Sequence, residues 1–157
     1  MPEDVPRPLT VLEVTVTGQR AEALVEVRPD AARTGAFPSF TANLLLALPG
    51  LASHECHNGR GRTFIEELRD TETAHAFEHV ALQLMRLAGS PATGETTWDF
   101  QRDGRGRYRV ALRFEDDLLC FGALRLAEQV IAAAAGEGEM HVLVDEVARL
   151  RGLAGQG

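Results

Sequence analysis

Apolar and polar positions alternate near the start of the chain. Within Leu9–Gly18, the apolar residues Leu12, Val14 and Val16 occupy every second position, a pattern typical of a strand with one buried face. A glycine-bearing turn separates this stretch from a second apolar run, Ala23–Val27. The two runs predict a β-hairpin.

Helical spacing is clearest over Thr73–Ala88. Its apolar side chains recur every three or four residues, at Ala74, Phe77, Ala81, Leu84 and Ala88, as on one face of a helix. Asp70, Thr71 and Thr73 are candidate N-caps, and Gly89 with Pro91 predicts the end of the helix. We expect this helix to pack across the sheet through Phe77, Ala81 and Leu84.

The remaining elements complete the order ββ-αα-ββ-αα. Further predicted strands are Thr96–Phe100 and Tyr108–Phe114, and further predicted helices are Phe40–Leu48, Phe64–Leu68, Leu118–Ala135 and Met140–Arg151. This order predicts an α+β fold, an antiparallel sheet with helices packed on one face. With 157 residues and no linker or repeat, the chain is expected to form a single domain, 1–157, with frayed ends.

Composition narrows the classes of function. The net charge is −7, and all 16 basic residues are arginine, so nonspecific binding to nucleic acid is not expected. No apolar run is long enough to cross a membrane, and no signal peptide is recognised at the N-terminus. Two cysteines make no disulfide framework, which predicts a cytoplasmic protein. Arginines do cluster locally, at 60 and 62 and at 102, 105, 107 and 109; they are either solvated or hold an anionic ligand.

The sequence His75-Ala-Phe-Glu78-His79 is the strongest candidate for chemistry. His75 and His79 are four residues apart, so both imidazoles lie on one helix face and can bind one zinc ion. Glu78 borders that face and is the candidate general base, taking a proton from a water molecule activated by the ion. This H-x-x-E-H order is the inverse of the H-E-x-x-H zinc-peptidase helix. The alternative is two partly buried histidines satisfied by neighbouring groups.

Other residues are candidates to complete the site. His54 and Cys56 have the donor types and spacing of zinc ligands, or else are a hydrogen-bonding loop histidine and a buried thiol. Catalytic zinc needs a third protein ligand, and the acidic run Glu115, Asp116 and Asp117 is the proposed source. Any one of these acids could instead cap the helix that follows.

A series of motifs over residues 48–89 resembles the N-terminal domain of cyanophycin synthetases. The motifs are Leu48-Pro-Gly-Leu, His54-x-Cys56, Gly59-x-Gly61, Phe64-x-x-x-Leu68, Thr71, Ala74-His75-x-x-Glu78-His79-Val80-Ala81-Leu82-Gln83-Leu84 and Leu87-Ala88-Gly89. The resemblance is looser beyond, at Gly94-x-Thr96 and at the strand entering the acidic run. Thr97 stands where that family has an arginine, and His57 where it has a serine.

The resemblance implies a domain that holds the Asp–Arg polymer and, in some members, a metallopeptidase-like site that trims it. It implies that His75 and His79 are metal ligands, that Glu78 is the base and that an acid in 115–117 is the third ligand. We therefore expect a zinc-dependent amide hydrolase acting on a cyanophycin-like or related peptide. Two alternatives stay open: a polymer- or partner-binding module with a vestigial site, and a structural zinc held by His54, Cys56, His75 and His79. Candidate partners are a second copy of the chain and a cyanophycin synthetase.

Overall fold

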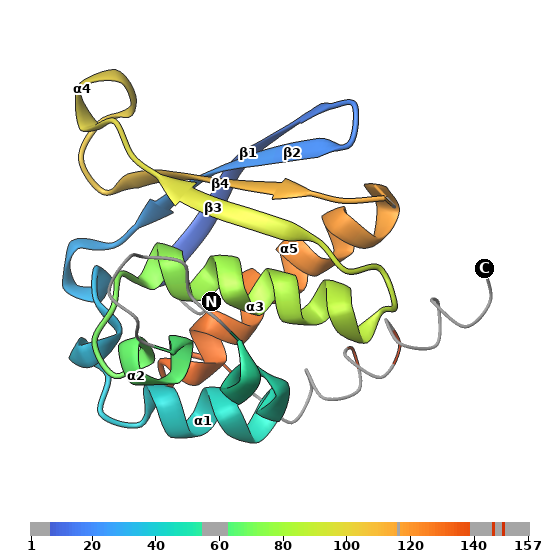
Figure 1. Cartoon of the computed structure of the whole chain (residues 1–157). Helices are drawn as coiled ribbons and strands as arrows, with labels where there is room; N and C mark the ends of the chain where they lie inside the picture. The colour runs from blue at the N-terminus through green and yellow to red at the C-terminus, as the bar shows by residue number, and fades with distance from the viewer. Residues whose placement is uncertain (1–6, 55–62, 116, 139–145, 147–148, 150–157) are drawn as a thin grey trace, which may run out of the picture.

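The computed structural model describes residues 7–54, 63–115, 117–138, 146 and 149. It has the predicted α+β architecture: a four-stranded antiparallel sheet in the order β1-β2-β4-β3, with the main helices on one face (Figure 1). The strands are β1 (Leu9–Thr17), β2 (Arg20–Val27), β3 (Thr93–Thr97) and β4 (Arg107–Arg113). The helices are α1 (Phe40–Ala47), α2 (Phe64–Leu68), α3 (Thr73–Leu87), α4 (Phe100–Asp103) and α5 (Asp117–Ala134). Short 3₁₀ turns cover η1 (Pro29–Ala31), η2 (Thr34–Ala36) and η3 (Pro49–Ser53).

The predicted hairpin forms, but a β-bulge changes which residues of β1 face the core. Val11 pairs with Val25, Val14 pairs with Ala23, and the register shifts between them. Directly paired residues share one face of a sheet, so Val11 and Val14 both lie on the face of the buried Val25 and Ala23. Leu12 is 43% exposed. The predicted alternation is therefore wrong at Leu12, which lies in the bulge, and correct for Val14, while Val16 lies on the same face as Val14 but is 39% exposed.

The third strand lies earlier in the chain than predicted. The structure has β3 at Thr93–Thr97 and a short helix, α4, where the prediction placed the end of strand Thr96–Phe100. The Asp99 carboxylate accepts hydrogen bonds from the backbone N–H groups of Gln101 and Arg102. This N-cap stabilises a helical turn at that point and ends the extended conformation.

Helix α3 packs against the sheet as predicted. Phe77, Ala81 and Leu84 are fully buried, and the helix runs beneath β3 and β4 (Figure 1). The predicted stop is also confirmed, because Gly89 adopts a φ of +77° just after the last turn. The predicted N-caps were wrong. The N-cap is Glu72, without a side-chain cap bond, and the hydroxyl of Thr73 instead donates to the Ala31 carbonyl.

Helices α1 and α2 lie below α3, and α4 lies apart from them at one end of the sheet (Figure 1). Helix α5 packs on α3 and β1, and α1 packs on α5. The predicted helix at Met140–Arg151 lies almost entirely outside the described residues. Within the part of the chain that the structure describes, no helix is both long and apolar enough to cross a membrane.

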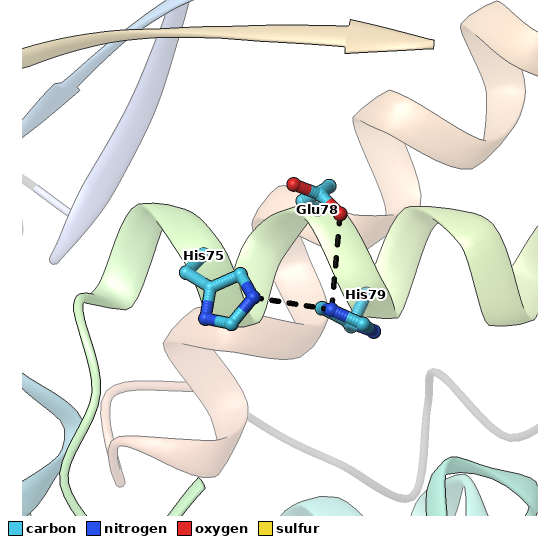
Figure 2. A group of neighbouring side chains, drawn as sticks. All are labelled: His75, Glu78 and His79. Atoms are coloured by element: carbon cyan, nitrogen blue, oxygen red, sulfur yellow. Dashed lines mark hydrogen bonds and ion pairs between the residues drawn. The ribbon is translucent and has the colours of Figure 1, made fainter. Parts of the chain in front are cut away.

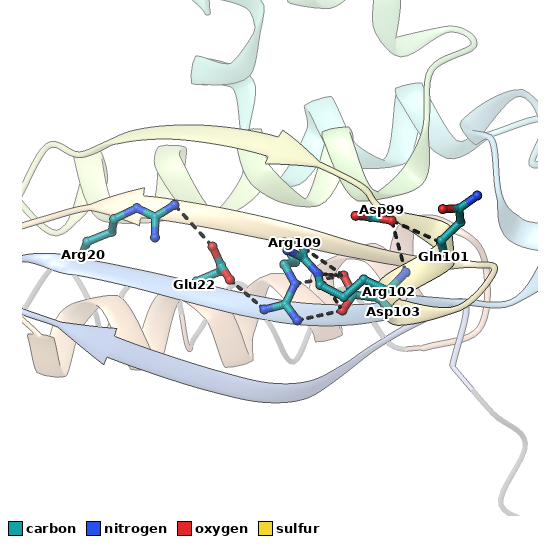
Figure 3. Close-up of polar contacts among 7 residues, drawn as sticks. All are labelled: Arg20, Glu22, Asp99, Gln101, Arg102, Asp103 and Arg109. Atoms are coloured by element: carbon teal, nitrogen blue, oxygen red, sulfur yellow. Dashed lines mark hydrogen bonds and ion pairs between the residues drawn. The ribbon is translucent and has the colours of Figure 1, made fainter.

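Two arginines of the predicted cluster at 102–109, Arg102 in α4 and Arg109 in β4, lie beside the carboxylate of Asp103 (Figure 3). Arg109 donates to both oxygens of Asp103, at 2.7 and 2.9 Å, and to Glu22 at 2.7 Å. Arg102 and Arg107 also form ion pairs with carboxylates. These contacts favour a structural role for the cluster over the binding of an anionic ligand.

Candidate functional site

One face of α3 contributes His75 and His79 to the wall of a cleft of about 1130 Å³, and Gln83, further along the same face, is buried. His75, His79 and Gln83 follow one another at intervals of four residues. Each such step rotates the position by roughly 40° around the helix, so the three side chains share a face. The cleft lies between this face, the strand β3 and the segment around α2, and its lining includes His54, Thr96 and Trp98.

His75 and His79 on this face, together with His54, which follows η3, form a continuous chain of close contacts. His75 Nε2 lies 3.1 Å from His79 Nε2, and His79 Nδ1 lies 3.0 Å from His54 Nδ1. His54 Nε2 in turn lies 2.7 Å from Gln83 Oε1. At the other end, Thr71 Oγ1 lies 3.0 Å from His75 Nδ1. Both ring nitrogens of all three histidines are therefore engaged with polar atoms.

Packing fixes the orientation of these rings. The Phe64 ring stacks on His79, with centroids 3.9 Å apart and an interplanar angle of 16°, and meets His75 edge-on. Phe64 opens α2, where Thr63 and Glu66 form a reciprocal capping box. The Phe64 N–H also donates to the carbonyl of His54. Helix α2 thus holds both His79 and the backbone that carries His54.

Glu78 lies beside the histidines, and a hydrogen bond from the sheet fixes its carboxylate. Its Oε1 accepts a hydrogen bond of 2.8 Å from the hydroxyl of Thr96. Its Oε2 lies 3.8 Å from His79 Nε2 (Figure 2). Thr96 reaches Glu78 because it pairs with the buried Val110 and so faces α3. One carboxylate oxygen is thereby fixed by the strand, and the other is directed toward His79.

Burial sets the charge state of the site. Burial, together with the neighbouring His75 and His54, lowers the pKa of His79 to about 3. Burial also lowers the pKa of His75 and of His54. The pKa of Glu78 is raised by burial, against the opposing effect of the Thr96 hydrogen bond. At neutral pH the three histidines are neutral, so their nitrogen lone pairs are available without the loss of a proton.

The donor set fits a divalent metal such as zinc. One ligand atom each from His75, Glu78 and His79 lie within 4.8 Å of one another. Two imidazole nitrogens on one tetrahedral zinc lie about 3.3 Å apart, from a Zn–N distance of about 2.0–2.1 Å, close to the 3.1 Å between His75 and His79. Two neutral imidazoles are common zinc donors, and a carboxylate beside them can act on a water molecule bound to the ion. His75 and His79 would hold the ion through their Nε2 atoms.

His54 lies on the far side of His79 from His75. His79 faces His75 with Nε2 and His54 with Nδ1, and the two nitrogens of one ring point in different directions. An ion between His75 and His79 therefore does not reach His54 in this arrangement. This geometry argues against the four-ligand structural site, although Cys56 lies outside the described residues.

The acidic run proposed to supply a third ligand is placed only in part. Glu115 is exposed and is absent from the residues that line the cleft. It follows Val110, the partner of Thr96, by five residues, which in an extended chain is roughly 16 Å along the strand. Asp117 is the first residue of α5. Asp116 lies outside the described residues. The described residues therefore give no support to a ligand from this run.

Sequence reasoning missed three residues that shape the site. Gln83 could have been found, because it continues the four-residue spacing of His75 and His79. Phe64 and Thr96 belong to the family motifs, but no spacing in the sequence indicated that either residue contacts α3. Their contacts with α3 depend on the placement of α2 and on the register of β3, which a single sequence does not contain.

Fold and site together define a class: an α+β domain with an H-x-x-E-H helix lying beneath an antiparallel sheet, its histidines open to a cleft. The profile of a family described as "Cyanophycin synthase-like N-terminal domain" matches residues 24–135. This chain belongs to that family.

Curated relatives agree with this assignment. The chain is 31% identical over 129 residues to a cyanophycin synthetase of Geminocystis herdmanii. The aligned region covers 69% of this chain and 15% of that relative. It is 32% identical over 110 residues to a cyanophycin synthetase of Synechocystis sp., covering 60% of this chain and 13% of the relative. The chain thus matches only a small part of the length of these synthetases.

Proposed function

We propose that this chain is a zinc-dependent amide hydrolase that cleaves a cyanophycin-like Asp–Arg polymer or a related peptide. The observation that carries the proposal is the convergence of His75 Nε2, His79 Nε2 and the Glu78 carboxylate at one point of the cleft wall. His75 and His79 would hold the ion, and Glu78 would act as the base.

Glu78 has the position and the protonation behaviour of a general base. A bound zinc ion would polarise the amide carbonyl and lower the pKa of a water molecule to about 7. Glu78 would take a proton from the attacking water as the water oxygen bonds to the carbonyl carbon. It would then deliver that proton to the amide nitrogen as the C–N bond breaks. A carboxylate with a raised pKa suits both steps, because its affinity for the proton is closer to that of its partners.

The charge of the cleft suits a cationic substrate. Its lining has more carboxylates than guanidinium groups: Glu66, Glu67, Asp70, Glu72, Glu78 and Glu95 against Arg33, Arg69 and Arg86. Trp98 is 53% exposed at the same cleft, and an indole face attracts a guanidinium group. Arginine side chains of an Asp–Arg polymer match both features.

A second candidate function is a polymer-binding module without hydrolysis. The observation that favours it is the relationship to cyanophycin synthetases, proteins named for synthesis, of which this chain covers 15% or less. In that case the acidic cleft would bind the polymer and the histidine site would be vestigial.

Incubation of the purified protein with cyanophycin distinguishes a hydrolase from a polymer-binding module. A hydrolase releases soluble Asp–Arg fragments with new amino termini, in a reaction that a chelator stops and zinc restores. A binding module sediments with the insoluble polymer and releases nothing, with or without zinc.

A further inference from the structure

The chain of contacts from His79 through His54 to Gln83 has a defined direction. The carbonyl oxygen of the Gln83 side chain only accepts hydrogen bonds, so the group facing it, His54 Nε2 at 2.7 Å, must carry a proton. A neutral His54 then has no proton on Nδ1, which lies 3.0 Å from His79 Nδ1. His79 must therefore donate from Nδ1, and its Nε2 keeps the lone pair.

We propose that His54 and Gln83 are positioning residues that hold His79 in the Nδ1–H tautomer, with its Nε2 lone pair directed at the metal site. This inference rests on the metal site of the proposed function but not on hydrolysis. Hydrogen bonding to the second nitrogen commonly fixes the tautomer of a metal-binding histidine. Here the partner is a second histidine, itself oriented by an amide.

The opposite direction would place the proton of His79 on Nε2. If the position of Gln83 Oε1 held a donor, His54 would carry its proton on Nδ1 and His79 would carry its own on Nε2. That proton would point at His75 Nε2, 3.1 Å away, and His79 could then bind an ion through Nε2 only after moving the proton to Nδ1. The acceptor at position 83 thus decides whether His79 can bind a metal without a change of tautomer.

The fold holds both positioning residues in place. Gln83 is buried, and its side-chain nitrogen lies 2.2 Å from where a Cβ of residue 50 would be, so only Gly50 leaves room for it. His54 follows η3, its backbone N–H donates to Leu51 and its carbonyl accepts from Phe64. These contacts come from the Leu48-Pro-Gly-Leu segment and from α2, so two separate parts of the chain orient His79.

Three variants test the proposal. Gln83→Glu keeps an acceptor in the same place, Gln83→Leu removes it at similar volume, and Met85→Leu is a control for packing on the buried side of α3. The tautomer of His79 is read from imidazole ¹⁵N chemical shifts in metal-free protein. Zinc affinity is read by competition with a chromophoric chelator, alongside urea denaturation as a check of folding.

The expected result is an Nδ1–H His79 in wild type, Gln83→Glu and Met85→Leu, all with similar zinc affinity. Gln83→Leu is expected to lose the preference for that tautomer and to bind zinc about 10–100-fold more weakly. An Nε2–H His79 in the wild type would overturn the proposal, as would wild-type zinc affinity in folded Gln83→Leu. A wild type that binds no zinc but shows the Nδ1–H tautomer would contradict the proposed function and leave the orienting chain itself supported.

Discussion

The hydroxyl of Thr96, on the edge strand β3, donates a 2.8 Å hydrogen bond to Oε1 of Glu78 on α3. This contact joins the sheet to the helix at the point where the predicted base lies. It stabilises the ionised carboxylate in a buried setting, against the effect of burial on its pKa. Thr96 therefore controls both the orientation and the protonation of Glu78.

Removal of that hydroxyl should raise the pKa of Glu78. In Thr96→Val, burial acts without the opposing hydrogen bond, so Glu78 stays protonated to a higher pH. The acidic limb of kcat/KM on cyanophycin should move to higher pH, and Thr96→Ser should restore the wild-type profile. The loss of the bond should also destabilise the protein by about 1–3 kcal/mol in urea denaturation. An unchanged acidic limb in folded, active Thr96→Val would show that Glu78 is not the group that titrates.

Gly50→Ala should destabilise the protein through Gln83. The added Cβ would lie 2.2 Å from the Gln83 side-chain nitrogen, so the buried amide must move, at a cost of about 1–3 kcal/mol. The test is a double-mutant cycle by urea denaturation. In a Gln83→Ala background the space is open, and Gly50→Ala should then cost much less. If Gly50→Ala lowers the free energy of unfolding equally in the wild type and in Gln83→Ala, the destabilisation does not come from contact with Gln83.

The metal-free protein should lose stability as the pH falls below neutral. The folded pKa of His79 is lowered to about 3, so between this value and about 6.5 the unfolded chain binds a proton that the folded chain does not. The resulting stability is present above pH 6.5 and is lost as the pH falls. For His79 alone the loss from pH 7.5 to 5.5 is about 1.4 kcal/mol. His54 and His75 act in the same direction.

Urea denaturation in the presence of a chelator measures this dependence. His79→Gln should lose less stability than the wild type over the same pH interval. Glu78 has a raised pKa and acts in the opposite sense, but it is present in both proteins. A wild type and a His79→Gln variant with the same pH dependence would contradict a neutral, buried His79.

Much of the fold followed from periodicity in the sequence. The α3 stripe predicted both its boundaries to within a residue and the burial of Phe77 and Leu84, because a helix 15 residues long repeats its pattern several times. The H-x-x-E-H spacing likewise placed His75 and His79 together, since both residues belong to one helix. Spacing along the sequence was sufficient to predict contacts between residues that belong to the same helix.

The remaining features depend on long-range geometry. The bulge at Leu12 reverses the inward face of β1, and nothing in the alternation itself marks it. The turn at α4 was hidden because Trp98 and Phe100 favour a strand by composition, while the Asp99 cap decides the local structure. The contact between Thr96 and Glu78 requires the register of β3 on β4, which only the folded sheet sets.

Both histidines of α3 should be needed for metal. His75→Ala and His79→Ala each remove one of two imidazole ligands, so zinc measured by mass spectrometry in protein purified without added metal should fall well below the wild-type content. Gln101→Ala, an exposed substitution in α4, is the control. Wild-type zinc content in His79→Ala would remove His79 from the ligand set.

The variant Glu78→Gln is the most direct test of Glu78 as a general base. The amide keeps the size of the side chain and can still bond to Thr96, but it cannot take a proton. Zinc content and the release of Asp–Arg fragments from cyanophycin are measured on the same preparations of wild type and variant. We expect Glu78→Gln to retain zinc and to lose hydrolysis by at least about 100-fold. Hydrolysis at the wild-type rate by Glu78→Gln, or a loss of its zinc, would contradict the role of Glu78 as a base that does not bind the metal.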